Sequence, residues 1–172
     1  MSNWLIYGLT SALFWGVYSI FSKIVTSDKY LKIQPDLSSL LMFAGISVVF
    51  LGYFLIKSPL DFNYKLLGIA LLISIIGIVL FFVNKSGVNI TWSVVLFGLG
   101  QGALWALGMV FTFLAFSSGA EAAKLVPIYN TNTLIAVLIG ISFLHEVPAP
   151  DERIKVISGA ILIVLGGILV SK

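Results

Sequence analysis

Six apolar stretches, each close to the length that a helix needs to cross a bilayer, follow one another with only short polar segments between them. Their bounds are roughly 3–25, 38–56, 66–83, 93–117, 122–144 and 155–171. A spanning helix needs about 20 mostly apolar residues. Hydrophobic residues make up 59% of the 172 residues and charged residues only 10%, whereas about 25% of the residues in a soluble domain are charged. This much apolar surface must face lipid or other helices, so we expect a single transmembrane domain over residues 1–172.

The stretches are continuous apolar runs, without the alternation of apolar and polar residues that a barrel strand requires. The expected fold class is therefore an all-α integral membrane protein, a bundle of about six transmembrane helices. The stretch 66–83 is nearly all aliphatic, as expected for a helix that faces lipid. If it did not cross, five spans would remain and the two termini would lie on opposite sides. The first stretch has no basic residue before it and is too long for a signal peptide, so we expect it to be a retained span.

Charged residues gather near the ends of these stretches. Ten Lys and Arg against seven Asp and Glu give a net charge of +3, which suits helices anchored in a lipid bilayer at anionic head groups. No basic run indicates nucleic-acid binding. With six crossings, the basic residues divide into six on one side and four on the other: Lys23, Lys29, Lys32, Lys85, Arg153 and Lys155 against Lys57, Lys65, Lys124 and Lys172. Because Lys and Arg favour the cytoplasmic side, both termini are expected outside the cytoplasm, in a multi-pass protein of the plasma or inner membrane. The alternative, since the difference is small, is insertion in both orientations.

No cluster of reactive side chains indicates an enzyme. The chain has no cysteine, and its one histidine, His145, has no second His or Cys at ligand spacing, so no metal site or cofactor is expected. His145 and Glu146 are the only candidates for a lipid-modifying reaction. All seven carboxylates lie in loops or at the ends of the apolar stretches, so we do not expect transport to be driven through a mid-membrane carboxylate. Glu146 remains a candidate either to cap a helix end or to gate or couple transport at a mouth.

The run from Pro127 to Thr133 is the most polar part of any span. At 1.5 Å per residue, Asn130 lies roughly 12 Å into the membrane. Pro127 has no amide hydrogen and frees a carbonyl one turn earlier. The polar side chains that follow it wrap most of the way round the helix, which favours a water-filled cavity of the kind that broken helices form in transporters. The alternative is that Asn130, Asn132 and the threonines only hold helices together.

Aromatic and amide side chains in two other spans are further candidates. Trp15 and Tyr18 lie in the middle of the first span, although such residues favour the membrane surfaces. They either shape a pocket or pack against other helices. Gln101 and Trp105, one helical turn apart, present the same two alternatives.

Pairs of small residues indicate places where helices approach closely. In the fourth span these are Gly98 and Gly102. In the sixth they are Gly159-Ala160 and Gly166-Gly167.

Several segments together resemble the drug/metabolite transporter superfamily, in its EamA-like branch. They are Ala12-Leu-Phe-Trp-Gly16 with Ser22-Lys23, Gly102-Ala-Leu-Trp-Ala-Leu-Gly108, the run from Leu114 through Ser117-Ser118-Gly119-Ala120-Glu121 to Pro127, Leu144-His-Glu146, and Ser158 to Gly167. They cover about two thirds of the chain, and His145 stands where the family usually has glycine. Family members have ten helices in two inverted halves of five. This chain corresponds to one half with one extra hydrophobic segment, 66–83, which would invert the last three helices relative to the first two if it crosses.

The resemblance implies a secondary transporter that moves a small metabolite, such as an amino acid, a sugar or a drug-like compound, by alternating access. A half-size member would act as a homodimer. The residues expected to line its substrate cavity are Trp15, Tyr18, Gln101, Trp105, Tyr129, Asn130 and Asn132. The alternative function is a membrane scaffold or subunit that does not transport.

Overall fold

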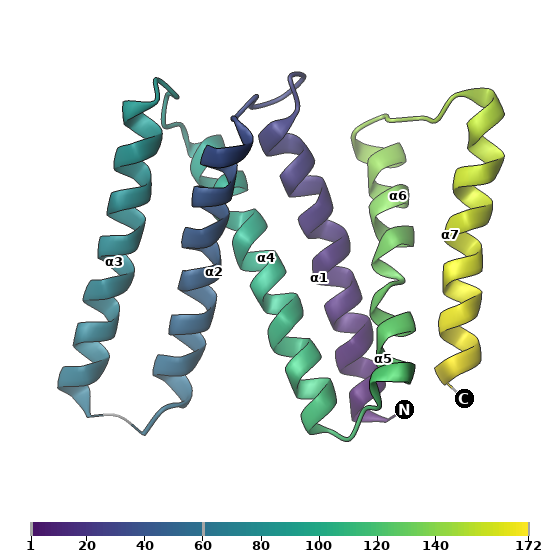
Figure 1. The fold of residues 1–172 in the computed structure, drawn as a ribbon, viewed down its shortest axis with the longest axis horizontal. Coiled ribbons are helices and arrows are strands. Elements are labelled where there is room, and N and C mark those ends of the chain that lie inside the picture. The colour runs from purple at the N-terminus through teal and green to yellow at the C-terminus, as the bar shows by residue number, and fades with distance from the viewer. Residues whose placement is uncertain (1, 60, 172) are drawn as a thin grey trace. The chain divides into compact units, whose positions relative to one another are not determined.

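A computed structural model describes residues 2–59 and 61–171. About 82% of the protein is helical, and the described residues contain no strand. The helices, labelled in Figure 1, are α1 Asn3–Thr26, α2 Pro35–Lys57, α3 Phe62–Lys85, α4 Trp92–Ser117, α5 Ala122–Tyr129, α6 Asn132–Phe143 and α7 Pro150–Ser171.

The helices divide into six segments that are each long and apolar enough to cross a membrane, with α5 and α6 together forming one of them. The expected helical fold with about six segments able to cross a membrane is therefore confirmed for the described residues. The segment α3, whose crossing the sequence left open, meets the same criteria of length and hydropathy as the others.

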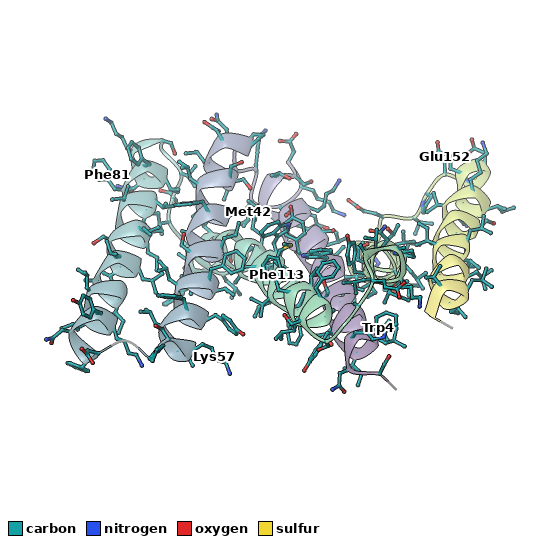
Figure 2. All side chains as sticks on the ribbon, turned by 60° about the horizontal axis from the view of Figure 1, so that its bottom comes forward. Trp4, Met42, Lys57, Phe81, Phe113 and Glu152 are labelled. Carbon is teal, nitrogen blue, oxygen red and sulfur yellow. The ribbon has the colours of Figure 1, made fainter. Side chains whose placement is uncertain are left out.

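Several helices begin before their apolar residues do. Helix α7 starts at Pro150, with Asp151 and Glu152 in its first turn. Proline suits the first helical position because its missing N–H would have no partner there, and the two carboxylates complement the positive end of the helix dipole. Figure 2 labels Glu152 at this end of α7 and Lys57 at the end of α2, so both charges lie at helix ends, away from the span centres.

Helices α4 and α5 are joined by a tight turn over Ser117–Glu121. Gly119 has a φ of +88°, in the left-handed region that glycine enters without strain. The amide of Ala120 donates to the carbonyl of Ala115 at 3.1 Å, and the amide of Gly119 donates to the carbonyl of Phe116 at 3.0 Å. This is the Schellman pattern that ends a helix.

The chain forms two compact units. Unit 1 comprises Met1–Ile20 and Leu107–Lys172, and unit 2 comprises Phe21–Ala106. Helices α1 and α4 each contribute residues to both units.

Unit 2 is held together by a close approach of α2 to α4. A Cβ on Gly45 would overlap the carbonyl oxygen of Leu99, and a Cβ on Gly102 would overlap that of Met42. The backbones therefore touch at two points, and Gly98 receives the side chain of Leu41. The prediction of a close helix contact at Gly98 and Gly102 is confirmed.

Helix α3 packs on α2, where Gly68 accommodates the side chain of Leu55. Val79 and Val83 of α3 join the buried cluster of unit 2. Most of the other α3 side chains are exposed, including Phe81, labelled in Figure 2. In a membrane this surface would face lipid, as the aliphatic sequence predicts.

Unit 1 packs α1 against α4 and against the interrupted span. Gly8 lies against Leu125 and Ile128 of α5. The hydroxyls of Ser11 and Thr112 both donate to the carbonyl of Gly108, at 2.9 and 3.0 Å.

Helix α7 completes unit 1, in contact with α5 and α6. A Cβ on Gly167 would lie 3.2 Å from the Thr131 side chain and 3.4 Å from the Pro127 carbonyl oxygen. Ala160 is also buried. The prediction of close packing does not hold for Gly159 and Gly166, because within the described residues a Cβ at either position would meet nothing within 4 Å.

Candidate functional site

The fifth span is broken at its polar run. Helix α5 ends at Tyr129 and α6 begins at Asn132, and Figure 1 shows the ribbon interrupted between them. The amide of Thr131 donates to the carbonyl of Ile128 at 3.1 Å, and the amide of Thr133 to that of Asn130 at 3.2 Å. These three-residue spacings replace the four-residue spacing of an α-helix. Two residues before the end of α5, Pro127 also removes the bond that the carbonyl one turn earlier would accept.

Some polar side chains at the break have hydrogen-bond partners within the protein, and others do not. Thr131 donates its hydroxyl hydrogen back to the Ile128 carbonyl at 2.7 Å, and the Thr133 hydroxyl lies 3.4 Å from the Asn132 side-chain oxygen. Asn130 is exposed, and the described residues supply no hydrogen-bond partner for its side-chain amide. The break therefore presents one amide that is open to a ligand or to water.

An aromatic pair lies beside the break. The rings of Trp15 on α1 and Tyr129 on α5 meet edge to face, with centroids 4.9 Å apart. Gly108 leaves room for the indole, because a Cβ there would overlap its ring nitrogen. A Cβ on the neighbouring Gly16 would lie 3.1 Å from the backbone oxygen of Asn132. Unit 1 therefore brings Trp15, Tyr129 and the backbone of Asn132 close together, and their assignment to a substrate cavity stays a prediction.

Tyr18 is the remaining predicted site residue in unit 1. It follows Trp15 by three residues on α1 and is half-buried. Its membership of the cavity stays a prediction.

Gln101 and Trp105 belong to unit 2. Gln101 is 2% exposed. It accepts a hydrogen bond from the Ser22 hydroxyl at 3.0 Å and donates to both the carbonyl and the hydroxyl oxygen of Ser38, each at 3.1 Å. The side-chain amide of Gln101 is therefore hydrogen-bonded to protein groups on neighbouring helices. Packing between helices is one of the two roles that the sequence left open for this residue. Trp105 is half-buried. The assignment of these two residues to the substrate cavity stays a prediction.

Two hollows flank the broken span within unit 1. The first has a volume of about 290 Å³ and lies among α1, the break and α7, with a mostly apolar lining: Leu5, Leu9, Ile128, Thr131, Leu134, Ile135, Val164, Gly167 and Ile168. The second, also of about 290 Å³, lies between α6 and α7 and is lined by Thr133, Ala136, Val137, Gly140, Ile141, Glu146, Pro148 and Val156.

The second hollow includes a residue that the sequence did not assign to the cavity. Glu146 lines it together with Thr133, so the carboxylate at the end of the fifth span and the polar run border the same space. Small residues on one helical face, Ala136 and Gly140, were the available signal, since they recur at four-residue spacing after the polar run.

Charges elsewhere are at the surface. Lys124 and Glu121 form an ion pair at 3.6 Å, and Lys32 and Asp28 form another at 3.1 Å. Exposed pairs of this kind contribute little to stability. Over the described ranges, no group of three or more His, Asp or Glu residues could hold a metal ion.

Comparisons with models of known protein families, with curated proteins and with solved structures each return no match.

Proposed function

We propose that this protein is a secondary transporter of small molecules, a half-size member of the EamA-like branch that acts as a homodimer in the plasma or inner membrane. The observation that carries the proposal is the broken fifth span, with the exposed amide of Asn130 at the break and the Trp15–Tyr129 pair beside it. The substrate would be an amino acid, a sugar or a drug-like compound.

The physical reason is the cost of polar groups in hydrocarbon. Backbone groups freed by a break and an amide without a partner are tolerated at membrane depth only where protein or cavity water satisfies them. Broken helices in transporters form substrate sites near the midplane in this way. Asn130 and Asn132 would bind the substrate by hydrogen bonds, and Trp15 and Tyr129 would contact its apolar part.

Dimerisation follows from the resemblance to half of a ten-helix transporter. Gly159 and Gly166 favour it, because within the described residues nothing packs at these positions of α7 and small residues let two helices approach closely. The extra helix α3 is the departure from the family, and it would change the orientation of α4 to α7 relative to α1 and α2.

The second candidate function, a scaffold or subunit that does not transport, is favoured by Gln101. Its side-chain amide joins Ser22 and Ser38, and every buried side-chain nitrogen and oxygen among the described residues has a hydrogen-bond partner. A protein whose polar residues only join helices would look like this in unit 2.

Exchange in reconstituted vesicles separates the two functions. Labelled leucine, glucose and phenethylamine would represent an amino acid, a sugar and a drug-like amine. A transporter is expected to exchange at least one of them, and Asn130→Leu and Asn132→Leu should abolish that exchange while helical circular dichroism stays unchanged. Asn84→Leu is the matched control, because Asn84 is exposed at the end of α3. If Asn130→Leu and Asn132→Leu instead prevented folding, the scaffold would be favoured.

A further inference from the structure

The first of the two hollows lies where α1 and α7 both touch the broken span. Gly8 of α1 packs on α5, because a Cβ there would lie 2.9 Å from the Leu125 side chain and 3.1 Å from that of Ile128. Gly167 of α7 packs beside the break, where its Cβ would lie 3.2 Å from the Thr131 side chain. Each helix therefore meets the broken span through a glycine, which lets the backbones approach closely. Figure 1 shows α6 between α1 and α7.

The walls of the hollow are the larger residues next to these two glycines. On α1 they are Leu5 and Leu9, three residues before the glycine and one residue after it. On α7 they are Val164 and Ile168, at the same two spacings. Leu9 and Ile168 are 41% and 50% exposed, whereas Ile128, which lines the hollow from the broken span, is 3% exposed. The hollow therefore has a buried floor on the broken span and an exposed rim on α1 and on α7.

The hollow extends through about one leaflet of the membrane. Its lining residue Leu5 follows the first residue of α1 by two positions, and lies about 3 Å into that helix. Ile135 follows the first residue of α5 by 13 positions, and lies about 20 Å along the broken span. Figure 1 shows α1 and α5 beginning at the same end of unit 1, where α7 ends. Because the hydrocarbon core is about 30 Å thick, the hollow reaches from near one membrane surface to about the middle.

The lining favours an apolar occupant. Thr131 has the one polar side chain among the described lining residues, and its hydroxyl hydrogen is already donated to the Ile128 carbonyl at 2.7 Å. A buried water molecule needs about two to four polar partners, which this lining does not supply. A charged ligand would have no counter-charge, because none of the described lining residues is ionisable. Hydrocarbon is therefore the chemistry that fits.

The size of the hollow decides which hydrocarbon group fits. Its volume is about 290 Å³, spread over about half the thickness of the hydrocarbon core. A helix of a second copy is about 10 Å wide with its side chains, which is too wide for a hollow of this volume and length. A single unbranched chain is narrow enough, and the lipids of one leaflet supply chains that run over the same depth.

We propose that this hollow binds one acyl chain of a membrane lipid. The chain would lie on Ile128 between the rims formed by Leu9 and Ile168, with the lipid head group at the end of unit 1 where α1 and α5 begin. It would supply the dispersion contacts that the lining of an empty hollow lacks. The inference goes beyond the proposed function, because binding of an acyl chain here requires neither transport nor a dimer.

A photoreactive lipid tests the hollow directly. Purified protein would be reconstituted in phosphatidylcholine vesicles that include a phosphatidylcholine with a diazirine in the middle of one chain, irradiated, and analysed by mass spectrometry. Ile128 should be labelled although it is 3% exposed, and Ile73 of α3, which is 66% exposed, is the control for ordinary lipid contact. Val164→Phe should lower labelling at Ile128 about tenfold and leave Ile73 unchanged, because a ring that fills the hollow to the packing density of a protein interior excludes the chain. Leu162→Phe is the matched control, because Leu162 is exposed on α7 outside the lining and should leave both labels unchanged.

Three results would overturn the proposal. One is labelling of Ile73 without labelling of Ile128, and an intermolecular disulfide formed by Leu9→Cys would then identify a second copy as the occupant. Another is labelling of Ile128 that Val164→Phe leaves unchanged. The third is reaction of Val164→Cys with a membrane-impermeant thiol reagent, which would show a water-filled hollow. If Val164→Phe does not fold, Leu9→Phe, which fills the hollow from α1, is read in the same way. None of these measurements requires exchange of a substrate, so failure of the lipid site and failure of the transporter are distinguishable.

Discussion

The indole ring of Trp15 stands edge-on to the ring of Tyr129, with 4.9 Å between the centroids and 79° between the planes. Aromatic pairs in this geometry contribute about 0.5–1.5 kcal/mol beyond the area that they bury. The pair joins α1 to the last residue of α5, immediately before the break. The pair therefore connects the residue before the break to α1, in the space that Gly108 leaves for the indole.

Gly108 provides that space, so Gly108→Ala should displace the indole. The new Cβ would overlap the Trp15 ring nitrogen, and an overpacked site of this kind costs about 1–3 kcal/mol. Unfolding in detergent would measure the loss, and near-ultraviolet circular dichroism would report the aromatic rearrangement. Gly77→Ala on α3 is the matched control, because a Cβ there would meet nothing within 4 Å, and this substitution should be neutral or stabilising by up to about 1 kcal/mol. Equal effects of the two substitutions would contradict this account.

The contact between α2 and α4 predicts a larger effect for Gly45→Ala. Its Cβ would overlap the backbone oxygen of Leu99, which cannot rotate away as a side chain can. The two helices would have to separate, and we expect a loss of about 3 kcal/mol or failure to assemble. Gly52→Ala lies on the same helix with nothing within 4 Å and should unfold like the native protein. A stable Gly45→Ala variant would show that the close approach is absent.

The amide of Gln101 predicts a coupled loss of stability. Gln101→Leu leaves the buried Ser38 hydroxyl without this partner and should cost about 1–2 kcal/mol. In a double-mutant cycle with Ser38→Ala, the two losses should be less than additive, since they remove the same bond. Ser39→Ala is the control, because the exposed Ser39 hydroxyl donates to its own helix at the Pro35 carbonyl. Additive losses would mean that the bond contributes nothing measurable.

The left-handed conformation of His145 predicts that glycine improves this position. His145→Gly removes the steric cost of a Cβ at positive φ and should raise stability by about 0.5–1 kcal/mol. His145→Val should lower it, because a branched Cβ fits this conformation worst. Thermal unfolding of the two variants in detergent measures both signs. A lower melting temperature for His145→Gly would show that the imidazole makes a contact that outweighs the backbone cost.

Much of the fold could be predicted from the sequence because hydropathy alone marks spans in a membrane protein. All six apolar segments were predicted. The predicted bounds left out the polar residues at some helix ends, as at Pro150, where α7 begins before its first apolar residue. Ser117–Glu121 contains its own glycine, so the hairpin turn was also predictable.

The candidate site could be predicted only where residues adjacent in the sequence indicate it. Pro127 and the polar residues after it mark the break, although the interruption itself falls at Asn130 and Thr131. The partners of Gln101 are Ser22 and Ser38, which are distant in sequence, so its environment could not be derived. The open space at Gly140 also depends on where α7 packs, which no local pattern reveals.

Thiol accessibility at the break tests the transporter most directly. Asn130→Cys and Asn132→Cys in sealed vesicles would be treated with a membrane-impermeant thiol reagent, added separately from each side. Ile73→Cys, exposed near the middle of α3, is the lipid-facing control, and Ser2→Cys is the control for reactivity. A water-filled path predicts labelling at Asn130→Cys and Asn132→Cys while Ile73→Cys stays silent. Silence at both break positions, in a folded protein whose Ser2→Cys control reacts, would show a dry helix interface and contradict the transporter.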